Sequence, residues 1–187
     1  MAISPDEKYI AVGSFDGTVR IILAEEWKVY KTLKKERNMQ ISVIKFSPKG
    51  NYLAFGSDDS YISVYKVSDF KPKYKMKKHP QHITGIDWSR DDYFLQSTCG
   101  GQELLYWKME SGEQHTTGAM KLRDEKWSSW TCPIGWPVQG IWKSGMTGNE
   151  VNSVERSHSK AREEYSLLAT GEKHKDVRVY RFPCLSK

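Results

Sequence analysis

Short runs of apolar and β-branched residues, separated by turn residues, recur along the chain. Residues 41–46 (Ile-Ser-Val-Ile-Lys-Phe) are mostly apolar, which is typical of a strand buried on both faces. A Ser-Pro-Lys-Gly-Asn turn at 47–51 leads to a second strand at 52–56. A tight turn at 57–60 then leads to a third strand at 61–65. The pattern predicts an all-β chain, since no segment has a convincing apolar period of about 3.6 residues.

The same pattern repeats at a nearly fixed spacing. Residues 4–14 match residues 47–57 at a shift of 43, and a third copy begins at Ser89 after a further shift of 42. A fourth copy ends with Leu-Ala-Thr-Gly at 168–171 and Val-Arg-Val-Tyr at 177–180. A period of about 40–45 residues with four short strands in each unit is typical of a β-propeller blade.

An insertion separates the third copy from the fourth. Val64, Tyr106 and Val179 align, and the last two are 73 residues apart. About 31 residues are therefore inserted within 112–161, and the remainder of the chain makes about 3.7 blades. The stretch 156–164 is compatible with a helix, but its polarity favours a loop.

The repeat array is expected to be incomplete at both ends. Counted in strands, the chain opens at the second strand of one blade and stops after the third strand of another. Propellers usually close with about four to eight blades, because each sheet has to be covered by its neighbours. We therefore expect either a fragment of a longer propeller protein or pairing with a completing chain. The expected blades span approximately 1–38, 39–78, 79–118 and 119–187, the last with a Trp-rich insertion.

The third copy resembles a WD40 blade. In well-formed WD40 blades a His, a Ser or Thr, an Asp and a Trp form a buried hydrogen-bond chain. The third copy keeps His79, Ser97 and Trp107 but has Gly101 at the position of the turn Asp. The first and second copies keep the turn Asp, as Asp16 and Asp59, but have Ile22 and Tyr65 at the Trp position. The fourth copy has His174 at the Asp position and Tyr180 at the Trp position. The resemblance implies a partial WD40-like β-propeller of about four blades, each an atypical four-stranded antiparallel sheet.

Neither the histidines nor the cysteines indicate a site of chemistry. His79 and His82 flank the entry to a strand, but a metal role needs three or four converging ligands, and no Cys or carboxylate falls at a suitable spacing. We therefore expect no metal and predict a structural hydrogen bond from His79 toward Ser97. Cys99 and Cys132 have no local base to activate them, so we expect small buried apolar side chains.

The insertion carries the most specific signal in the chain. A T-C-x-x-G-W-P-V-x-G-I-W run at 131–142 is followed by N-x-V-x-R-S-H at 152–158, then by L-A-T-G and F-P-C. This succession closely resembles the echinoderm microtubule-associated protein-like family, in the later part of its second propeller. The resemblance departs at 171–176, where the family usually has acidic and Gly residues. It implies tandem atypical propellers in one rigid body, tubulin and microtubules as partners, and a cytoplasmic, cytoskeletal location on microtubules, with those of the axoneme as one candidate.

The tryptophans of the insertion allow two interpretations. They could form a platform for a peptide or an aromatic group, but we favour filling of the wedge between neighbouring sheets, because buried indoles contribute so much apolar area. We expect two glycines to adopt positive φ or to permit close backbone approach. The residues of this structural signature are Trp127, Trp130, Cys132, Gly135, Trp136, Gly140 and Trp142.

Lysines alternate with other residues on a predicted outer strand. Period-2 spacing puts Lys71, Lys73, Lys75 and Lys77 on one face, and Lys78 extends the run. Edge protection is the interpretation we favour, since charged residues and Pro discourage pairing of an exposed strand. The functional alternative is a basic stripe that faces the acidic surface of tubulin. A second cluster, at the corresponding strand one blade earlier, comprises Lys28, Lys31, Lys34, Lys35 and Arg37.

Composition and motif searches narrow the function. The 29 Lys and Arg residues exceed the 23 Asp and Glu residues, which permits an acidic partner without requiring one. Three cysteines without CxxC spacing argue against a disulfide framework or zinc ribbon and favour a reducing compartment. No run is long enough for a membrane span, and nucleic-acid binding rests only on the sequence pI of 9.1. Nucleotide-binding, protease and calcium-loop motifs are absent, so we expect neither enzymatic activity nor a cofactor.

The leading hypothesis is a non-enzymatic cytoskeletal module, part of a microtubule-associated protein that binds tubulin through a rigid propeller. The alternative is a general WD40 scaffold whose propeller binds a peptide or complex unrelated to tubulin, because fold alone does not decide function.

Overall fold

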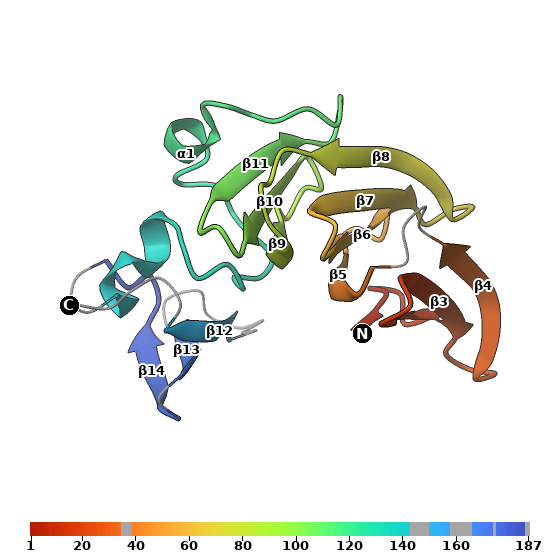
Figure 1. The fold of residues 1–187 in the computed structure, drawn as a ribbon, viewed down its shortest axis with the longest axis horizontal. Coiled ribbons are helices and arrows are strands. Elements are labelled where there is room, and N and C mark those ends of the chain that lie inside the picture. The colour runs from red at the N-terminus through yellow and green to blue at the C-terminus, as the bar shows by residue number, and fades with distance from the viewer. Residues whose placement is uncertain (35–38, 143–149, 158–165, 174, 186–187) are drawn as a thin grey trace. The chain divides into compact units, whose positions relative to one another are not determined.

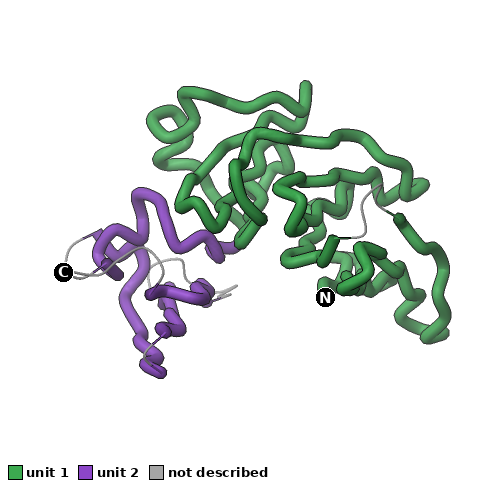
Figure 2. The backbone as a smooth tube through the Cα atoms, viewed as in Figure 1, with its two compact units in different colours: residues 1–128 green, residues 129–187 purple. Residues whose placement is uncertain are grey.

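The computed structural model describes residues 1–34, 39–142, 150–157, 166–173 and 175–185. The chain divides into two compact units, residues 1–128 and residues 129–187 (Figure 2). Strands dominate both units (Figure 1), and the helices of the described residues are one short turn in each unit. None of these described helices is long and apolar enough to cross a membrane. The prediction of an all-β chain is confirmed.

Unit 1 contains three antiparallel sheets in which strands adjacent in sequence are adjacent in space. The first has the order β1-β2-β3-β4, with β1 at Ala2–Ile3, β2 at Tyr9–Gly13, β3 at Thr18–Leu23 and β4 at Lys28–Lys34. The second has the order β5-β6-β7-β8, with β5 at Ile41–Phe46, β6 at Tyr52–Ser57, β7 at Tyr61–Lys66 and β8 at Lys71–Lys77. The third has the order β11-β10-β9, with β9 at Ile83–Trp88, β10 at Phe94–Cys99 and β11 at Leu104–Lys108.

Unit 2 contains a fourth sheet and the Trp-rich segment from Trp130 onward, whereas Trp127 belongs to unit 1. The sheet has the order β12-β13-β14, with β12 at Val151–Arg156, β13 at Leu167–Glu172 and β14 at Val177–Arg181. A 3-10 segment, η1 at Trp136–Ile141, precedes the sheet, whereas the single α-helical turn, α1 at Gly118–Lys121, belongs to unit 1. Within the described residues this sheet contains three strands, of which β14 is the last. The loop expected at 156–164 lies largely outside the described residues.

Two expectations about strand number need correction. The first sheet already contains a two-residue innermost strand, β1, which pairs with β2 through Ala2 and Ala11, so the array opens earlier than the second strand. The third sheet lacks a full fourth strand. Its outer position is a stub in which Gln114 bridges Trp107 and the His115 amide donates to the Tyr106 carbonyl, before the chain turns into α1. The expected blade limits stay predictions.

Strand register supports the repeat alignment in all four sheets. In every sheet, the residue at the position of the WD40 tryptophan pairs with an equivalent residue on the preceding strand. These pairs are Ile22 with Ile10, Tyr65 with Leu53, Trp107 with Leu95, and Tyr180 with Leu168. Repeats with one strand order and one register are propeller blades in the structural sense. The fold is therefore a partial WD40-like β-propeller, as predicted.

Within unit 1 the sheets pack face to face around two apolar cores. The first core joins Val19 and Ile21 to Leu53 and Phe55, and the second joins the second sheet to Trp88. Two equivalent glycines permit this approach, because a Cβ at Gly13 would lie 2.5 Å from Ile41 Cγ2, and one at Gly56 would lie 2.5 Å from Ile83 Cβ. The first residue of each following innermost strand therefore packs directly onto the preceding sheet.

Turns reach the left-handed region at the same place in each repeat, whatever residue stands there. In the hairpin between the second and third strands, φ is +79° at Gly17, +66° at Ser60, +59° at Gln102 and +66° at Lys175. In the turn between the first and second strands, φ is likewise positive at Glu7, Gly50 and Asp92. In the turn that follows the third strand, φ is positive at Trp27, Phe70 and Gly112. Because a side chain in this region is strained, the sheets and not the local residue impose the turn.

Exchange of residues between two equivalent hairpins tests this conclusion. Ser60→Gly should raise the free energy of unfolding by about 0.5–1 kcal/mol, since glycine relieves the positive φ. Gly17→Ser should lower the free energy of unfolding by a similar amount. Urea-induced unfolding monitored by tryptophan fluorescence measures both, and destabilisation by Ser60→Gly would contradict the prediction.

Candidate functional site

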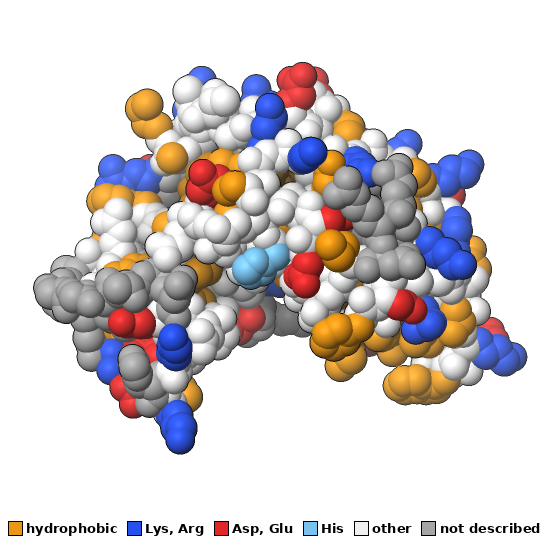
Figure 3. Space-filling model, in the orientation of Figure 1, with side chains coloured by type: hydrophobic (Ala, Val, Ile, Leu, Met, Phe, Trp, Pro, Cys, Tyr) orange, Lys and Arg blue, Asp and Glu red, His pale blue; other side chains and the backbone are white. Residues whose placement is uncertain are grey.

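The lysines predicted for two outer strands lie on β4 and β8. Basic side chains are visible along the right-hand edge of Figure 3, where β4 lies. The exposed members of the set are Lys28, Lys34, Lys71, Lys75, Lys77 and Lys78, whereas Lys31 and Lys73 are half-buried. Lys35 and Arg37 lie outside the described residues. Both strands are the outermost of their sheets, so the expected position at the edge of the fold holds.

A β-bulge interrupts the lysine stripe on β8. Val64 pairs with Tyr74 and Tyr65 pairs with Pro72, which leaves Lys73 as the extra residue of the bulge. Period-2 alternation therefore fails at this point, and the four lysines do not share one face. Lys75 and Lys77 do share a face, with their Nζ atoms 4.8 and 5.2 Å from the centroid of the Tyr61 ring.

Lys73 joins the second sheet to the third. Its Nζ atom donates hydrogen bonds to Tyr52 Oη at 2.9 Å and to the Met109 carbonyl at 3.0 Å, and it lies 4.4 Å from the centroid of the Tyr52 ring. Burial alone lowers the pKa of Lys73, but the hydrogen bond and attraction to Tyr52 outweigh it and raise the pKa overall. Tyr74, the next residue, donates its hydroxyl hydrogen to the Glu110 carbonyl at 2.6 Å. Two consecutive side chains thus reach the third sheet, because the bulge turns both toward it.

The first sheet makes an equivalent connection to the second. A bulge on β4 leaves Tyr30 as the extra residue, and its ring packs 6.0 Å from the ring of Phe70. Lys31 then donates a hydrogen bond from Nζ to the Asp69 carbonyl at 2.8 Å. Lys31 and Lys73 therefore connect neighbouring sheets, and the partner contact predicted for them stays a prediction.

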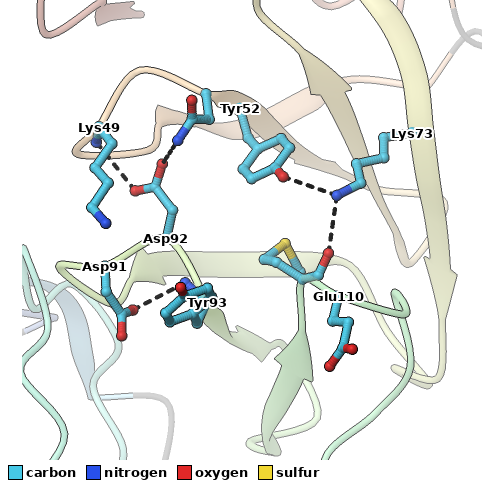
Figure 4. A pocket seen from close by; sticks show the side chains of 9 residues that line it. Lys49, Tyr52, Lys73, Asp91, Asp92, Tyr93 and Glu110 are labelled. Atoms are coloured by element: carbon cyan, nitrogen blue, oxygen red, sulfur yellow. Dashed lines mark hydrogen bonds between the residues drawn. The ribbon is translucent and has the colours of Figure 1, made fainter.

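A depression of about 580 Å³ lies between the second and third sheets (Figure 4). It is lined by Lys49, Asn51, Tyr52, Lys73, Asp91, Asp92, Tyr93, Met109 and Glu110. An equivalent depression of about 420 Å³ lies between the first and second sheets. Both carboxylates and ammonium groups line the larger depression, so its walls do not present charge of one sign to a ligand. Neither depression contains a Ser, Cys or His beside a base in the arrangement that nucleophilic catalysis needs.

Asp92 is the central polar contact of the larger depression. This buried carboxylate accepts hydrogen bonds from the Lys49 amide at 3.1 Å and Asn51 Nδ2 at 3.0 Å (Figure 4). It also accepts a hydrogen bond from Ser47 Oγ at 2.7 Å. All three donors belong to the preceding sheet's first turn. Asp92 therefore ties the third repeat to the second.

The reason for this contact is a substitution within the repeat. In the first and third copies, an aspartate two residues after the turn serine accepts the serine hydrogen bond, through Ser4 with Asp6 and Ser89 with Asp91. The second copy has Lys49 at that position, and Asp92 supplies the missing carboxylate from the next sheet. Sequence reasoning missed Asp92, although the change to Lys49 was a visible signal that the serine needed another acceptor.

The WD40-type hydrogen bonds predicted for the third copy are present. His79 Nε2 lies 2.7 Å from Ser97 Oγ, and Trp107 Nε1 donates to the same oxygen at 2.8 Å. Burial lowers the pKa of His79 to about 4, so the imidazole is neutral near pH 7. His82, at the entry to β9, is exposed.

The Trp-rich segment agrees only partly with its predicted structural role. Trp127, Trp130 and Cys132 are buried, and Trp142 donates from Nε1 to the Pro133 carbonyl at 2.9 Å. Trp136, in contrast, is 37% exposed. It opens η1, whose three-residue turn buries Val138 and Ile141 on one side and leaves Trp136 and Gln139 on the other. Filling of a wedge by Trp136 therefore stays a prediction, since its indole is not fully covered by the described residues.

The sequence also predicts structural roles for the two glycines of the Trp-rich segment and for two of the cysteines, Cys99 and Cys132. Gly135 has φ of +138°, as expected. The Gly140 amide donates to the Cys184 carbonyl at 2.8 Å, and a need for glycine at this position stays a prediction. The three cysteines, Cys99, Cys132 and Cys184, are free thiols in buried positions. Burial raises the pKa of the Cys184 thiol, which makes it a poor nucleophile.

Removal of the Lys73 ammonium should destabilise the protein. Lys73→Met keeps the unbranched apolar stem and loses two hydrogen bonds and the contact of the ammonium group with the Tyr52 ring, so the free energy of unfolding should fall by about 1–2 kcal/mol. Lys71→Met is the matched control, since its exposed pair with Asp69 contributes less than about 0.5 kcal/mol. Urea unfolding measures both, and equal shifts would show that Lys73 is only a surface lysine.

Asp92→Asn tests the contact between the second and third repeats. Asparagine tolerates the positive φ of +66° at this position, so the change isolates the loss of the charge and of one acceptor oxygen. The free energy of unfolding should fall by about 1.5–3 kcal/mol. Asp58→Asn, at an exposed turn position, should change it by less than about 0.5 kcal/mol. Equal stability of the two variants in urea would contradict the proposed role of Asp92.

Comparison with known proteins agrees with this geometry over the full chain. The sequence pattern of the family described as "Echinoderm microtubule-associated protein second beta-propeller" matches residues 1–187. Human echinoderm microtubule-associated protein-like 1 is 36% identical over 184 residues, which cover 96% of this chain and 22% of that protein. The 77 kDa echinoderm microtubule-associated protein of Lytechinus variegatus is 34% identical over 183 residues, covering 96% of this chain and 26% of that protein.

The chain thus spans about a quarter or less of the length of these relatives. Its repeats, its register and its Trp-rich segment all fall within the matched region. The chain belongs to the echinoderm microtubule-associated protein family and corresponds to part of the second β-propeller.

Proposed function

We propose that this chain is a non-enzymatic module of a microtubule-associated protein and binds tubulin through its propeller. Membership of the family carries the proposal, since the relatives are named as microtubule-associated proteins. The lysines that remain exposed on the outer strands supply the contact: Lys28, Lys34, Lys71, Lys75, Lys77 and Lys78. The proposed location is the cytoplasm, on the microtubules of the cytoskeleton. In cells that have an axoneme, its microtubules are one candidate site.

Shape and charge together provide the mechanism. Propeller sheets hold the outer strands rigidly, so lysines on β8 present a fixed pattern of charge to an acidic partner. Lys75 and Lys77 lie at the end of β8, Lys78 follows directly after it, and all three side chains are exposed. Exposed charges are screened over about 8–10 Å at physiological ionic strength, so binding should weaken as salt rises.

The remainder of the propeller is the second proposed partner. Large apolar side chains of the first sheet and its turns are exposed, among them Ile3, Phe15 and Val29. A neighbouring blade would bury such side chains, as the second sheet buries Val19 and Ile21. The completing blades come from further segments of the same protein or from another chain.

The alternative function is a scaffold that binds a peptide unrelated to tubulin. Trp136 favours it, because an indole that is 37% exposed could stack on an apolar residue of a partner. Trp136→Ala should abolish peptide capture if this alternative holds, and it should leave tubulin binding unchanged if the outer strands carry the interaction.

Charge reversal on β8 tests the leading proposal. Lys75→Glu, Lys77→Glu and Lys78→Glu, made together in the protein with its complete propeller, should weaken co-sedimentation with microtubules about tenfold, since exposed ion pairs contribute roughly 0.5 kcal/mol each. The matched control reverses three exposed lysines elsewhere in unit 1, Lys108, Lys121 and Lys126. Equal binding by the two triple variants, with intact circular dichroism, would remove the β8 lysines from the interface.

A further inference from the structure

Three side chains that can bind metals meet at one end of the third sheet, in unit 1. His79 precedes β9, Cys99 ends β10, and Glu103 immediately precedes β11. A ring nitrogen of His79, the Cys99 thiol sulfur and a Glu103 carboxylate oxygen all lie within 4.8 Å of one another. Sequence spacing gave no sign of this group, because its members come together only when the hairpin between β10 and β11 closes beside the segment that enters β9.

One buried atom in this group has no hydrogen-bond partner. His79 is 5% exposed, and its Nε2 atom is already engaged with Ser97 Oγ at 2.7 Å. Nδ1 is buried and unpartnered. A buried polar atom in that state costs about 1–3 kcal/mol, so a ligand for Nδ1 would stabilise the fold.

The missing partner has a cause in the sequence. Gly101 stands where the aligned repeats carry Asp16 and Asp59, whose carboxylates accept hydrogen bonds in their own hairpins. Glycine offers no side chain, and a Cβ at this position would lie 3.5 Å from Cys99 Sγ. The third hairpin thus lacks a carboxylate at the turn and has a thiol and Glu103 beside it.

We propose that His79, Cys99 and Glu103 bind a zinc ion. Thiolate, imidazole and carboxylate are the three ligand types of zinc sites, whereas Mg²⁺ and Ca²⁺ take oxygen ligands. One thiolate and one carboxylate neutralise the double positive charge, and the exposed side of Glu103 leaves a fourth position for water.

Small movements suffice to form the site. Bonds of about 2.0–2.3 Å place the ligand atoms of a tetrahedral zinc about 3.3–3.8 Å apart, so the group has to contract by on the order of 1 Å. Rotation of the exposed Glu103 side chain supplies most of this movement. The Nε2–H of His79 would then donate to Ser97, which fixes the ring as outer hydrogen bonds do in metal sites.

Such an ion would tie the segment before β9 to the hairpin between β10 and β11, in place of the turn aspartate. A competing arrangement needs no metal, because Glu103 could accept a hydrogen bond from Nδ1–H of His79 directly. The two arrangements differ in their dependence on zinc and on Cys99.

The experiment uses the whole chain, freed of metal with a chelator and then dialysed against Zn²⁺ or Co²⁺. We expect one equivalent of zinc by elemental analysis, a raised melting temperature, and a thiolate-to-cobalt charge-transfer band with Co²⁺. Glu103→Gln is an exposed change and should weaken zinc binding at least about tenfold, whereas the exposed control Glu113→Gln should not. Cys99→Ser should abolish the charge-transfer band, and Cys184→Ser should retain it.

Two results would overturn the proposal. The first is the absence of stoichiometric zinc, or zinc uptake that neither Cys99→Ser nor Glu103→Gln alters. The second is a loss of stability in Glu103→Gln that is equal with and without zinc, which would assign Glu103 as a simple hydrogen-bond acceptor for His79. Neither result bears on microtubule binding, which is measured separately.

Discussion

Burial of one sheet face against the next is the constraint on which unit 1 depends. A four-stranded antiparallel sheet has two faces, and an apolar face is stable only when another layer covers it. Val19 and Ile21 meet Leu53 and Phe55 in this way, with almost no exposed area. The close approach at Gly56 shows how little space separates the layers. Sequence differences between the repeats have to be accommodated around this packing.

The polar contacts between repeats follow from that packing. Once two sheets lie face to face, their turns and outer strands are within hydrogen-bond distance, and bulges direct side chains across the gap. Lys73 reaches the Met109 carbonyl for this reason, and Lys31 reaches that of Asp69. A lysine that the sequence predicts to face solvent can thus form a hydrogen bond between two sheets of the fold. The lysines that stay exposed are those outside the bulges, among them Lys75 and Lys77.

Strands, turns and repeat period could be predicted from the sequence because each depends on local residue choice. The limits of the strand predicted at 41–46 agree with β5, since alternation and turn chemistry act over a few residues. Features that depend on two repeats at once could not be predicted. Pro72 is compatible with either an edge strand or a bulge and so does not fix the register at Lys73. Lys49 signals that Ser47 needs another acceptor, but it does not identify Asp92, which lies 43 positions later. His79, Cys99 and Glu103 similarly converge only in three dimensions.

Trp136 illustrates a third limit. Composition favours burial of a tryptophan, but the three-residue turn of η1 has room for only one buried side, and Val138 with Ile141 occupies it. Hydrophobicity alone does not say which side chain of a short helix points inward.

The carboxylate of Asp92 has a consequence for the repeats as modules. A copy of the second repeat placed in the third position would bring Gly50 to the site of Asp92, and Ser47 would lose its acceptor. A copy of the third repeat placed in the second position would bring Asp91, which accepts the hydrogen bond of its own turn serine, Ser89. That turn would need no carboxylate from the next repeat. The second and third repeats are therefore not interchangeable, because the turn of one is matched to the carboxylate of the other. Exchanging their order would weaken the contact between neighbouring sheets even if every strand still formed.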